Sequence, residues 1–538
     1  MANLWRFLLI ALMLLSTITA EIFTSMDQLQ RLSTVEKNLH ETLDLYIMQE
    51  RKRLEDLKGI YAAKKEELKK RERDDEVYHP LDVFRVINRV SSEWSTVEKL
   101  VRFNPHKSEF IQEIRNYHAS FPSDADFDGT RAAMLRLQKV YNISSQSISS
   151  GVIPGQRNAH ARLSGIDSYQ IGRKAYEDGN IIQAKAWMEN TLRMMGTSES
   201  LQNLTGHVVV SRNDVLNHLA FLEYKIGDLA RSLRFYREML VNDPNDTELQ
   251  SNIRKLKHLI AKQPHLNVTS PPNTANRIED DGDDELSREE MAEYTRLCRP
   301  NSQTRLPSSN KQLTCSYLNK HPGLKLKPVA MEIVSVNPQI TLFHNVLSEM
   351  EIEQMLKLAR PRLRRARVNN LETGEIEDVD YRISQIAWLS DSDGDIVRRI
   401  NRRVGFITGL NTNTGECLQV NNYGVGGHYE PHFDHSLDME NSPIASLGQG
   451  NRIATFMFYL SEVEAGGSTV FIKTGVKTNP FKGGAVFWYN LKKSGEGDWD
   501  SLHAGCPVLI GNKWVANKWL HEHGNEFTRQ CGLTEDED

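Results

Sequence analysis

The stretch GGHYEPHFDH, residues 426–435, contains three histidines, a glutamate and an aspartate. Imidazole and carboxylate groups at this density are typical ligands of a divalent metal ion. In an extended strand, residues two apart share a face at about 6.6 Å, whereas residues four apart are separated by about 13 Å. His432 and Asp434 can therefore bind one ion. His428 faces the same way but lies too far along the strand, and His435 points to the other face.

Glu430 and His432 have the same spacing, so spacing alone does not decide between the two pairs. A third ligand should come from a distant strand that passes close by, and His503 is the best candidate because it begins a strand that returns after Gly511 and Asn512. Two imidazoles and one carboxylate leave one face of the ion open, as in non-haem Fe(II) oxygenases. A closed structural zinc site usually includes thiolates, and no cysteine is placed for one.

Lys513 follows His503 by ten residues, and its ammonium group could pair with the far carboxylate of a dicarboxylate co-substrate such as 2-oxoglutarate. The alternative is a solvent-facing lysine in a turn. In a hairpin with a strict two-residue turn, His503 and Lys513 would lie on opposite faces. The functional interpretation therefore needs a three-residue turn, or a bulge near Pro507, because proline within a strand indicates an edge or a bulge.

The region that must position these residues has the pattern of a β domain. Beyond about residue 330, short β-rich runs such as RIATFMFYL, STVFI, GGAVFWYN and KWVANKWL are separated by glycines. Short strands at this spacing predict a β-sandwich, a jelly roll or a barrel.

The first half of the chain has helical periodicity instead. Apolar residues recur every three or four positions from Leu29 to Tyr61, with a polar turn at Glu50, and a second stripe runs from Phe84 to Val101. This pattern predicts amphipathic helices that form either a coiled-coil interface or a hairpin packed on itself.

Between residues 165 and 245, small residues recur at an interval of twelve, which is typical of tetratricopeptide units. Such helix pairs form a concave groove that suits an extended peptide. Aromatic residues at helical spacing belong either to that groove or to the helical core. The candidate groove aromatics are Tyr176, Trp187, Phe221 and Tyr224.

The ends and the charge of the chain limit its class. The chain has 538 residues, too many for one core, and its formal net charge of -5 gives no reason to expect nucleic acid. The N-terminal run WRFLLIALMLLSTITA predicts a secretory signal peptide, and it is too short for a stable membrane span. The acidic stretch TSPPNTANRIEDDGDDELSREE predicts a solvated linker.

Secretion makes the cysteines candidates for oxidation. The simplest pairing of the five joins Cys298 to Cys315 and Cys506 to Cys531, and it leaves Cys417 free. The glycosylation sequons, all in the first half, begin at Asn142, Asn203, Asn245 and Asn267. The chain ends in TEDED, without a lumenal retention tetrapeptide.

Several long stretches resemble the α-subunit of collagen prolyl 4-hydroxylase: LQVNNYGVGGHYEPHFD, GNRIAT, AGGSTVF, AVFWYN, SGEGD and HAGCPVLIGNKWVANKWLHE. The resemblance implies that His432, Asp434 and His503 are the iron ligands. It implies that Lys513 binds the distal carboxylate of 2-oxoglutarate. The residues that it places around the co-substrate are Tyr423, Trp519 and, with a looser match, Thr469.

The resemblance also implies a multidomain α + β fold. We expect a signal peptide (1–20), a helical coiled-coil dimerisation region (21–150) and a tetratricopeptide-like peptide-substrate-binding domain (160–265). A linker with a probable disulfide (266–330) would precede a double-stranded β-helix, or jelly-roll, dioxygenase domain (331–535). The cysteine pairing given above agrees with the two intrachain disulfides of the family.

The activity implied by the resemblance is hydroxylation of peptidyl proline at C4 in collagen-like chains, coupled to oxidative decarboxylation of 2-oxoglutarate to succinate and CO2. Fe(II), 2-oxoglutarate, O2 and ascorbate are the implied cofactors and co-substrates. The implied assembly is a tetramer of two α-subunits with two copies of protein disulfide isomerase in the lumen of the endoplasmic reticulum. The isomerase's own retention signal would explain the TEDED tail.

Two other functions are weighed against this activity. One is a non-catalytic subunit that binds proline-rich secretory clients, and the other is a β-sandwich metalloenzyme of different chemistry, such as a cupin-like isomerase. The complete ligand set with Lys513 argues against both. In the groove, Ile181, Ile182, His218 and Phe221 stand where the family often has tyrosines, so we expect weaker binding of poly-proline.

Overall fold

The computed structural model describes residues 22–71, 97, 105–153, 156, 162–202, 209–262, 287–300, 302, 313–369, 376–377, 379–439 and 442–532. The predicted signal peptide, the second apolar stripe apart from Val97, and the sequons at Asn203 and Asn267 lie outside these residues. The chain divides into two compact units, one of residues 28–122 and one of residues 1–27 with 123–538. Within the described ranges, no helix has the length and apolar character needed to cross a membrane.

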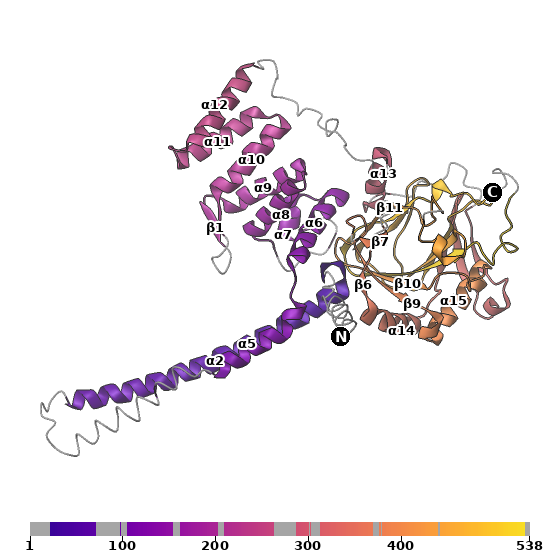
Figure 1. Ribbon diagram of the computed structural model, residues 1–538, viewed down its shortest axis with the longest axis horizontal. Helices are drawn as coiled ribbons and strands as arrows, with labels where there is room; N and C mark the ends of the chain where they lie inside the picture. Colours follow the sequence, from indigo (N-terminus) through magenta and orange to yellow (C-terminus); the bar gives the residue numbers. More distant parts are fainter. Residues whose placement is uncertain are drawn as a thin grey trace, which may run out of the picture. The chain divides into compact units, whose positions relative to one another are not determined.

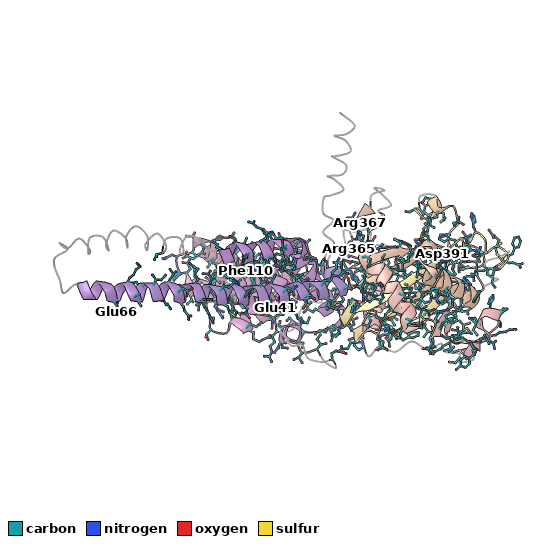
Figure 2. The ribbon with its side chains drawn as sticks, turned by 90° about the horizontal axis from the view of Figure 1, so that it is seen from below. Glu41, Glu66, Phe110, Arg365, Arg367 and Asp391 are labelled. Atoms are coloured by element: carbon teal, nitrogen blue, oxygen red, sulfur yellow. A yellow bond between two sulfur atoms is a disulfide. The ribbon has the colours of Figure 1, made fainter. Side chains whose placement is uncertain are left out.

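The unit of residues 28–122 is helical. Helix α2 (Met26–Arg71) continues through Glu50, where the sequence suggested a turn, and α5 (Pro105–Tyr117) lies beside it. The ring of Tyr46 stacks on Phe110, which Figure 2 labels, with ring centroids 5.0 Å apart. Large apolar side chains nevertheless remain exposed on α2, among them Leu45, Met48, Leu54 and Tyr61.

The peptide-domain region consists of paired helices: α8 (Gly165–Glu177), α9 (Ile181–Met195), α10 (Arg212–Ile226), α11 (Leu229–Asn242) and α12 (Thr247–Lys262). Strands β1 (Ser200–Gln202) and β2 (Val209–Ser211) pair between α9 and α10. Small residues let the helices approach closely. A Cβ at Gly172 would lie 3.0 Å from the Cβ of Trp187, and the Ser232 hydroxyl donates to the Ala220 carbonyl at 2.7 Å. The predicted tetratricopeptide-like fold is confirmed.

The C-terminal half contains two facing β-sheets, coloured orange to yellow in Figure 1. The larger sheet has nine strands, in the order β3 (Cys315–Leu318), β4 (Val329–Val336), β5 (Gln339–His344), β16 (Ala485–Tyr489), β12 (Arg452–Tyr459), β19 (Lys513–His521), β10 (Leu418–Tyr423), β9 (Gln385–Leu389), β6 (Arg364–Arg365). The smaller sheet has four strands, in the order β11 (Tyr429–His432), β17 (His503–Gly505), β14 (Thr469–Phe471), β15 (Val476–Thr478). Short pairs are formed by β13 (Ala465–Gly466) with β18 (Val508–Ile510), and by β7 (Val368–Asn369) with β8 (Ile376–Glu377). The predicted jelly-roll architecture is confirmed.

Apolar side chains of both sheets meet in the space between them. Tyr423, Tyr459 and Val515 of the larger sheet contribute to the same cluster as Phe471 and Val476 of the smaller one. The outer face of the larger sheet packs against α14 (Glu349–Ala359) and α15 (Asp395–Thr408) in a second cluster. The larger sheet is therefore packed on both faces, with one core shared with the smaller sheet and one shared with α14 and α15.

Helices α6 (Asp124–Tyr141) and α13 (Arg288–Cys298) cover the smaller sheet. Arg136 of α6 donates to the carbonyl of Gly426 at 2.7 Å, and the Tyr141 hydroxyl donates to the carbonyl of Pro507. Thus α6, which the sequence assigned to a dimerisation region, packs on the β domain. Likewise α13 lies within the predicted linker. A further short helix, α7 (Ser145–Ser150), follows α6.

Serine is the N-cap residue of many of these helices. In α6, α8, α10, α13 and α14, the serine before the helix accepts from the backbone three residues on, and the acidic side chain there binds the serine N–H in return. This capping box satisfies two N–H groups that the helix leaves unpaired. The boundary of each helix is therefore set by local sequence.

The predicted cysteine pairing is wrong in this structure. Cys298, the last residue of α13, is bonded to Cys506, with their Cα atoms 5.5 Å apart. Both side chains are buried, because α13 packs over the chain between β17 and β18, whereas Cys315, Cys417 and Cys531 are exposed and free. The disulfide therefore joins α13 to the β domain instead of closing two short loops.

The first described residues belong to the β domain as well. We call residues 22–25 the N-terminal strap. The carbonyl of Thr24 accepts from the N–H of Gly424 at 3.1 Å, and the Ser25 hydroxyl donates to Asn422 at 2.6 Å. Thr24 and Ser25 are fully buried. The strap thus lies against the end of β10, next to Tyr423.

Candidate active site

Three side chains that could bind a metal converge between the two sheets. His432 ends β11, Asp434 follows it, and His503 begins β17, directly across the strand pair from His432. The Nε2 atoms of His432 and His503 lie 3.9 Å and 3.6 Å from the two carboxylate oxygens of Asp434. One ligand atom from each residue lies within 4.8 Å of the others. The distant strand invoked from the sequence is therefore β17.

A β-bulge decides which neighbours of His432 share its face. The register between β11 and β17 shifts between Tyr429 and His432, so regular alternation does not hold across Pro431. As a result Tyr429 lies beside His432, with ring centroids 3.5 Å apart. Glu430, which spacing left open as a ligand, instead pairs with His428 at 3.6 Å and, like His428, lines a cavity shared with α6 and α13.

Main-chain carbonyls fix the orientation of both imidazoles. Nδ1 of His432 lies 2.7 Å from the carbonyl of Glu430, and Nδ1 of His503 lies 2.9 Å from the carbonyl of Ser501. A nitrogen that faces a carbonyl must carry the hydrogen, so each ring presents the lone pair of Nε2 to the shared space. Metal-binding histidines commonly have this arrangement.

The charges of the three groups suit a divalent ion. Burial lowers the pKa of His432 to about 3, so this imidazole is neutral at physiological pH. Burial alone would raise the pKa of Asp434, but His503, His432 and Arg452, together with a hydrogen bond from Thr455, lower it to about 2. A neutral imidazole and an ionised carboxylate are the protonation states that bind metal. The residues present therefore fit the two-histidine, one-carboxylate site of a non-haem iron enzyme.

Lys513 points into the same space. It pairs with Tyr423 across β10 and β19, its Nζ lies 5.1 Å from the centre of the Tyr423 ring, and its side chain is 3% exposed. A Cβ at Gly505 would lie 3.8 Å from Nζ, so the ammonium group reaches from the larger sheet to β17. A solvent-facing lysine is thereby excluded.

The single hairpin considered from the sequence does not exist. β17 ends at Gly505, and Cys506 and Pro507 belong to no strand. Lys513 begins a strand of the other sheet. The irregularity expected near Pro507 is present. Its effect is to pass the chain from one sheet to the other, which lets His503 and Lys513 face each other across the gap.

The other predicted co-substrate residues also line the space between the sheets. Trp519 lies on the same face of β19 as Lys513, and its ring is 3.9 Å from the Arg452 guanidinium. Thr469 accepts a hydrogen bond from the Tyr459 hydroxyl at 3.0 Å. Tyr459 and Tyr429 were not predicted from the sequence as residues of the site. An aromatic residue in an apolar strand has the same pattern whether it lines a pocket or belongs to the core.

Among the predicted groove aromatics, three are at least partly accessible. Tyr176 meets Phe221 edge to face at 5.6 Å, and Phe221 and Tyr224 are 36% and 44% exposed. Trp187, in contrast, is fully buried, and its indole N–H donates to Gln138 at 2.8 Å. Its assignment to the groove is wrong, because it forms the close helix crossing at Gly172.

Two facing sheets, a His-x-Asp pair with a distant histidine, and an inward lysine define the class of Fe(II)- and 2-oxoglutarate-dependent oxygenases. Residues 418–521 match the model of the 2OG-Fe(II) oxygenase superfamily. Residues 25–155 match the prolyl 4-hydroxylase alpha-subunit N-terminal region, and residues 165–262 match the prolyl 4-hydroxylase peptide-substrate-binding domain.

The chain belongs to the prolyl 4-hydroxylase alpha-subunit family. It is 38% identical over 541 residues to prolyl 4-hydroxylase subunit alpha-1 of Homo sapiens, covering 99% of both chains. It is 36% identical to subunit alpha-2 of Caenorhabditis elegans, covering 99% of this chain and 97% of that one. A solved structure, viral collagen prolyl hydroxylase vCPH from Paramecium Bursaria Chlorella virus-1 in its 2OG complex, aligns with a TM-score of 0.28 and 23% identity, over 34% of this chain and 94% of that one.

Proposed function

We propose that this chain hydroxylates C4 of peptidyl proline in collagen-like chains and converts 2-oxoglutarate and O2 to succinate and CO2. The observation that carries the proposal is the convergence of His432, Asp434 and His503 opposite the buried ammonium group of Lys513. The match of the helical half to a peptide-substrate-binding domain supports a peptide as the second substrate.

Each side chain has a distinct role in this proposal. His432, Asp434 and His503 hold Fe(II), which supplies the chemistry of O2 activation when bound. Lys513 binds the distal carboxylate of 2-oxoglutarate, and Tyr423, Thr469 and Trp519 border the co-substrate. Lys513 and His503 are buried, and burial strengthens the charge interaction of Lys513 with its ligand.

The function is tested by measuring succinate release with 2-oxoglutarate and Fe(II), with and without a (Pro-Pro-Gly) repeat peptide. We expect the proline peptide to stimulate release and to acquire one oxygen atom per hydroxylated proline, while a peptide with alanine in place of proline gives no stimulation. Binding of the proline peptide without either product would instead identify a non-catalytic peptide-binding subunit.

The affinity for 2-oxoglutarate should depend on pH through Lys513. Burial lowers the pKa of this ammonium group to about 7. Below that pH the lysine is already charged. Above it, binding of the carboxylate must draw a proton from the buffer, so the Kd should rise by up to about tenfold per pH unit. Calorimetry from pH 6 to 9, in buffers of different ionisation enthalpy, should show proton uptake that appears only on the alkaline side. A constant Kd without proton uptake would contradict the assignment.

The accessible aromatics of the helical domain should bind proline rings. Replacing both Phe221 and Tyr224 with alanine removes two exposed rings, each worth about 0.5–1.5 kcal/mol, so poly-proline affinity should fall by roughly 5- to 150-fold. Val241→Ala, at an exposed position on α11, is the matched control. The measurement is calorimetry of the full chain with a poly-proline peptide. Unchanged affinity in the double variant would place the groove elsewhere.

We further propose that the chain acts in the lumen of the endoplasmic reticulum, with ascorbate as a reductant, as an assembly of two α-subunits and two copies of protein disulfide isomerase. The support is the family resemblance, the N-terminal apolar run, and the exposed apolar side chains of α2, which are available for self-association. Asn142 and Asn245 are exposed, as glycosylation requires. Light scattering of the chain expressed with and without the isomerase tests the assembly, and a soluble, active monomer would contradict it.

A further inference from the structure

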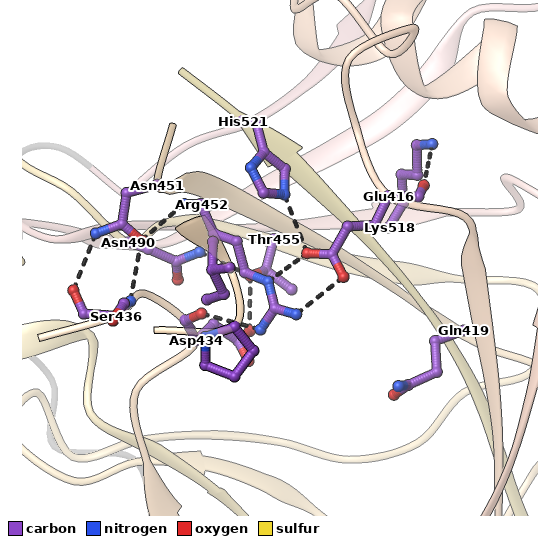
Figure 3. Close-up of polar contacts among 12 residues, drawn as sticks. Glu416, Gln419, Asp434, Ser436, Asn451, Arg452, Thr455, Asn490, Lys518 and His521 are labelled. Carbon is purple, nitrogen blue, oxygen red and sulfur yellow. Dashed lines mark hydrogen bonds and ion pairs between the residues drawn. The ribbon is translucent and has the colours of Figure 1, made fainter. Parts of the chain in front are cut away.

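Asp434 is held by two consecutive hydrogen bonds from buried polar side chains of the larger sheet and the residue directly after it. Thr455, in the middle of β12, donates its hydroxyl to Oδ2 of Asp434 at 2.7 Å. Asn490, directly after β16, donates its amide N–H to the Thr455 hydroxyl oxygen at 2.9 Å. Figure 3 shows the three side chains and the bonds between them. Thr455 and Asn490 are fully buried, and Asp434 is 6% exposed.

The chemistry of the three groups sets the direction of both bonds. An ionised carboxylate only accepts hydrogen bonds, and a hydroxyl has one hydrogen to donate. The Thr455 hydrogen must therefore point to Asp434, and the group facing the Thr455 oxygen must be a donor, which the Asn490 amide supplies. Consecutive hydrogen bonds that share one donor-to-acceptor direction polarise and strengthen one another in a buried site.

The anchors at the far end of these two hydrogen bonds are rigid. The main-chain N–H of Asn490 donates to the main-chain carbonyl of Ile453 at 2.9 Å. The main-chain carbonyl of Asn490 accepts from the N–H of Asp498 at 2.8 Å. Thr455 lies between two paired strands, opposite Trp488 on one side and Trp519 on the other. Neither donor can follow Asp434 if the carboxylate turns.

The main chain of Asp434 is fixed separately. Its carbonyl accepts from Arg452 at 3.1 Å, and the Arg452 guanidinium binds the Glu416 carboxylate at 2.9 Å and packs on Trp519. His521 also binds Glu416, at 3.0 Å. With the backbone held, the remaining freedom of Asp434 is rotation of its carboxylate. Thr455 controls that rotation.

We propose that Thr455, oriented by Asn490, is a positioning residue that keeps Oδ2 of Asp434 hydrogen-bonded and so fixes the rotation at which the carboxylate faces His432 and His503. This inference rests on the proposed metal site. The Asn490–Thr455 pair would therefore keep the Asp434 carboxylate in the orientation in which it can hold the metal together with His432 and His503.

The test measures binding of Co(II), a redox-stable substitute for Fe(II), by its visible absorption in the full-length protein. Thr455→Val keeps the shape of the side chain but removes the donor, and it should weaken Co(II) binding by about 10- to 100-fold. Thr455→Ser restores the hydroxyl and should recover most of the affinity. Asn490→Asp replaces the donor with an acceptor, which draws the Thr455 hydrogen away from Asp434, so it should weaken binding at least as much as Thr455→Val.

The matched control is Thr341→Val on β5. Thr341 is also buried in the larger sheet, and its hydroxyl accepts a bond from Gln339 rather than from the site. We expect this variant to lose thermal stability without losing Co(II) affinity. The proposal is overturned if Thr455→Val binds Co(II) like the wild type, or if Thr455→Ser fails to restore binding in a folded protein. Absence of Co(II) binding in the wild type would instead overturn the proposed metal site itself. If Thr455→Val does not fold, Asn490→Asp and Thr455→Ser still decide.

Discussion

Replacing Lys513 with alanine is expected to weaken binding of 2-oxoglutarate by two to four powers of ten, while metal binding by His432, Asp434 and His503 stays largely intact. Lys513 is 3% exposed and reaches from β19 to Gly505, so the carboxylate that it would bind is out of water. Removing one partner of a buried charge pair costs about 3 to 5 kcal/mol, which corresponds to this loss of affinity.

The measurement is succinate release as a function of 2-oxoglutarate concentration, together with direct binding of 2-oxoglutarate. Lys513→Arg keeps the charge but not the compact shape, so it should recover part of the loss. Lys518→Ala is the matched control, because Lys518 is a buried lysine on the same strand whose ammonium group binds the Glu416 carbonyl. It should reduce stability and leave the concentration dependence unchanged. An unchanged concentration dependence in Lys513→Ala would require the co-substrate pocket to be sought on another strand.

His503→Ala should abolish turnover at every concentration of 2-oxoglutarate. His503 is the ligand from the distant strand, and its Nε2 lies 3.6 Å from the Asp434 carboxylate. Without it, the ion keeps only the two ligands near the end of β11 and loses the link to β17. The defect should therefore appear in metal binding itself, and excess co-substrate should not correct it, unlike the defect of Lys513→Ala.

His428→Ala provides the comparison for this variant. His428 is as deeply buried as His503 and lies close to β11, but it pairs with Glu430 on the side of α6 and α13. Its loss should lower the melting temperature without abolishing metal binding. Co(II) titration and thermal unfolding of both variants check the difference. Turnover in His503→Ala, or loss of the metal in a folded His428→Ala, would contradict the assignment of ligands.

The sequence predicted the candidate metal site better than its surroundings, for physical reasons. Only a few side chains bind iron, so a dense group such as His432 and Asp434 draws attention by residue type alone. Whether Glu430 or Tyr429 shares the face of His432 depends on one extra residue in β11, and alternation carries no information about that bulge. A strand pattern cannot reveal it without the partner strand.

The helices and sheets were predictable from periodicity, while contacts between distant segments were not. Trp187 and Phe221 both occur in segments with helical periodicity. Trp187 is nevertheless buried at a helix crossing, whereas Phe221 is accessible. The bond between Cys298 and Cys506 depends on how α13 packs over the smaller sheet, which the spacing of cysteines does not encode. Local pattern identifies an element, but its neighbours are determined by packing over the whole domain.

The N-terminal strap has a consequence for synthesis of the protein. Ser25 and its partner Asn422 are separated by 397 residues, so roughly three quarters of the 538-residue chain is made between the two. At a synthesis rate of roughly 5–20 residues per second, Asn422 is made on the order of 20 to 80 s after Ser25. Docking of the strap therefore joins a segment that is made early to a strand that is made much later. A recombinant fragment that starts after Asp27 would lack the strap, and the N–H of Gly424 would have to find another partner.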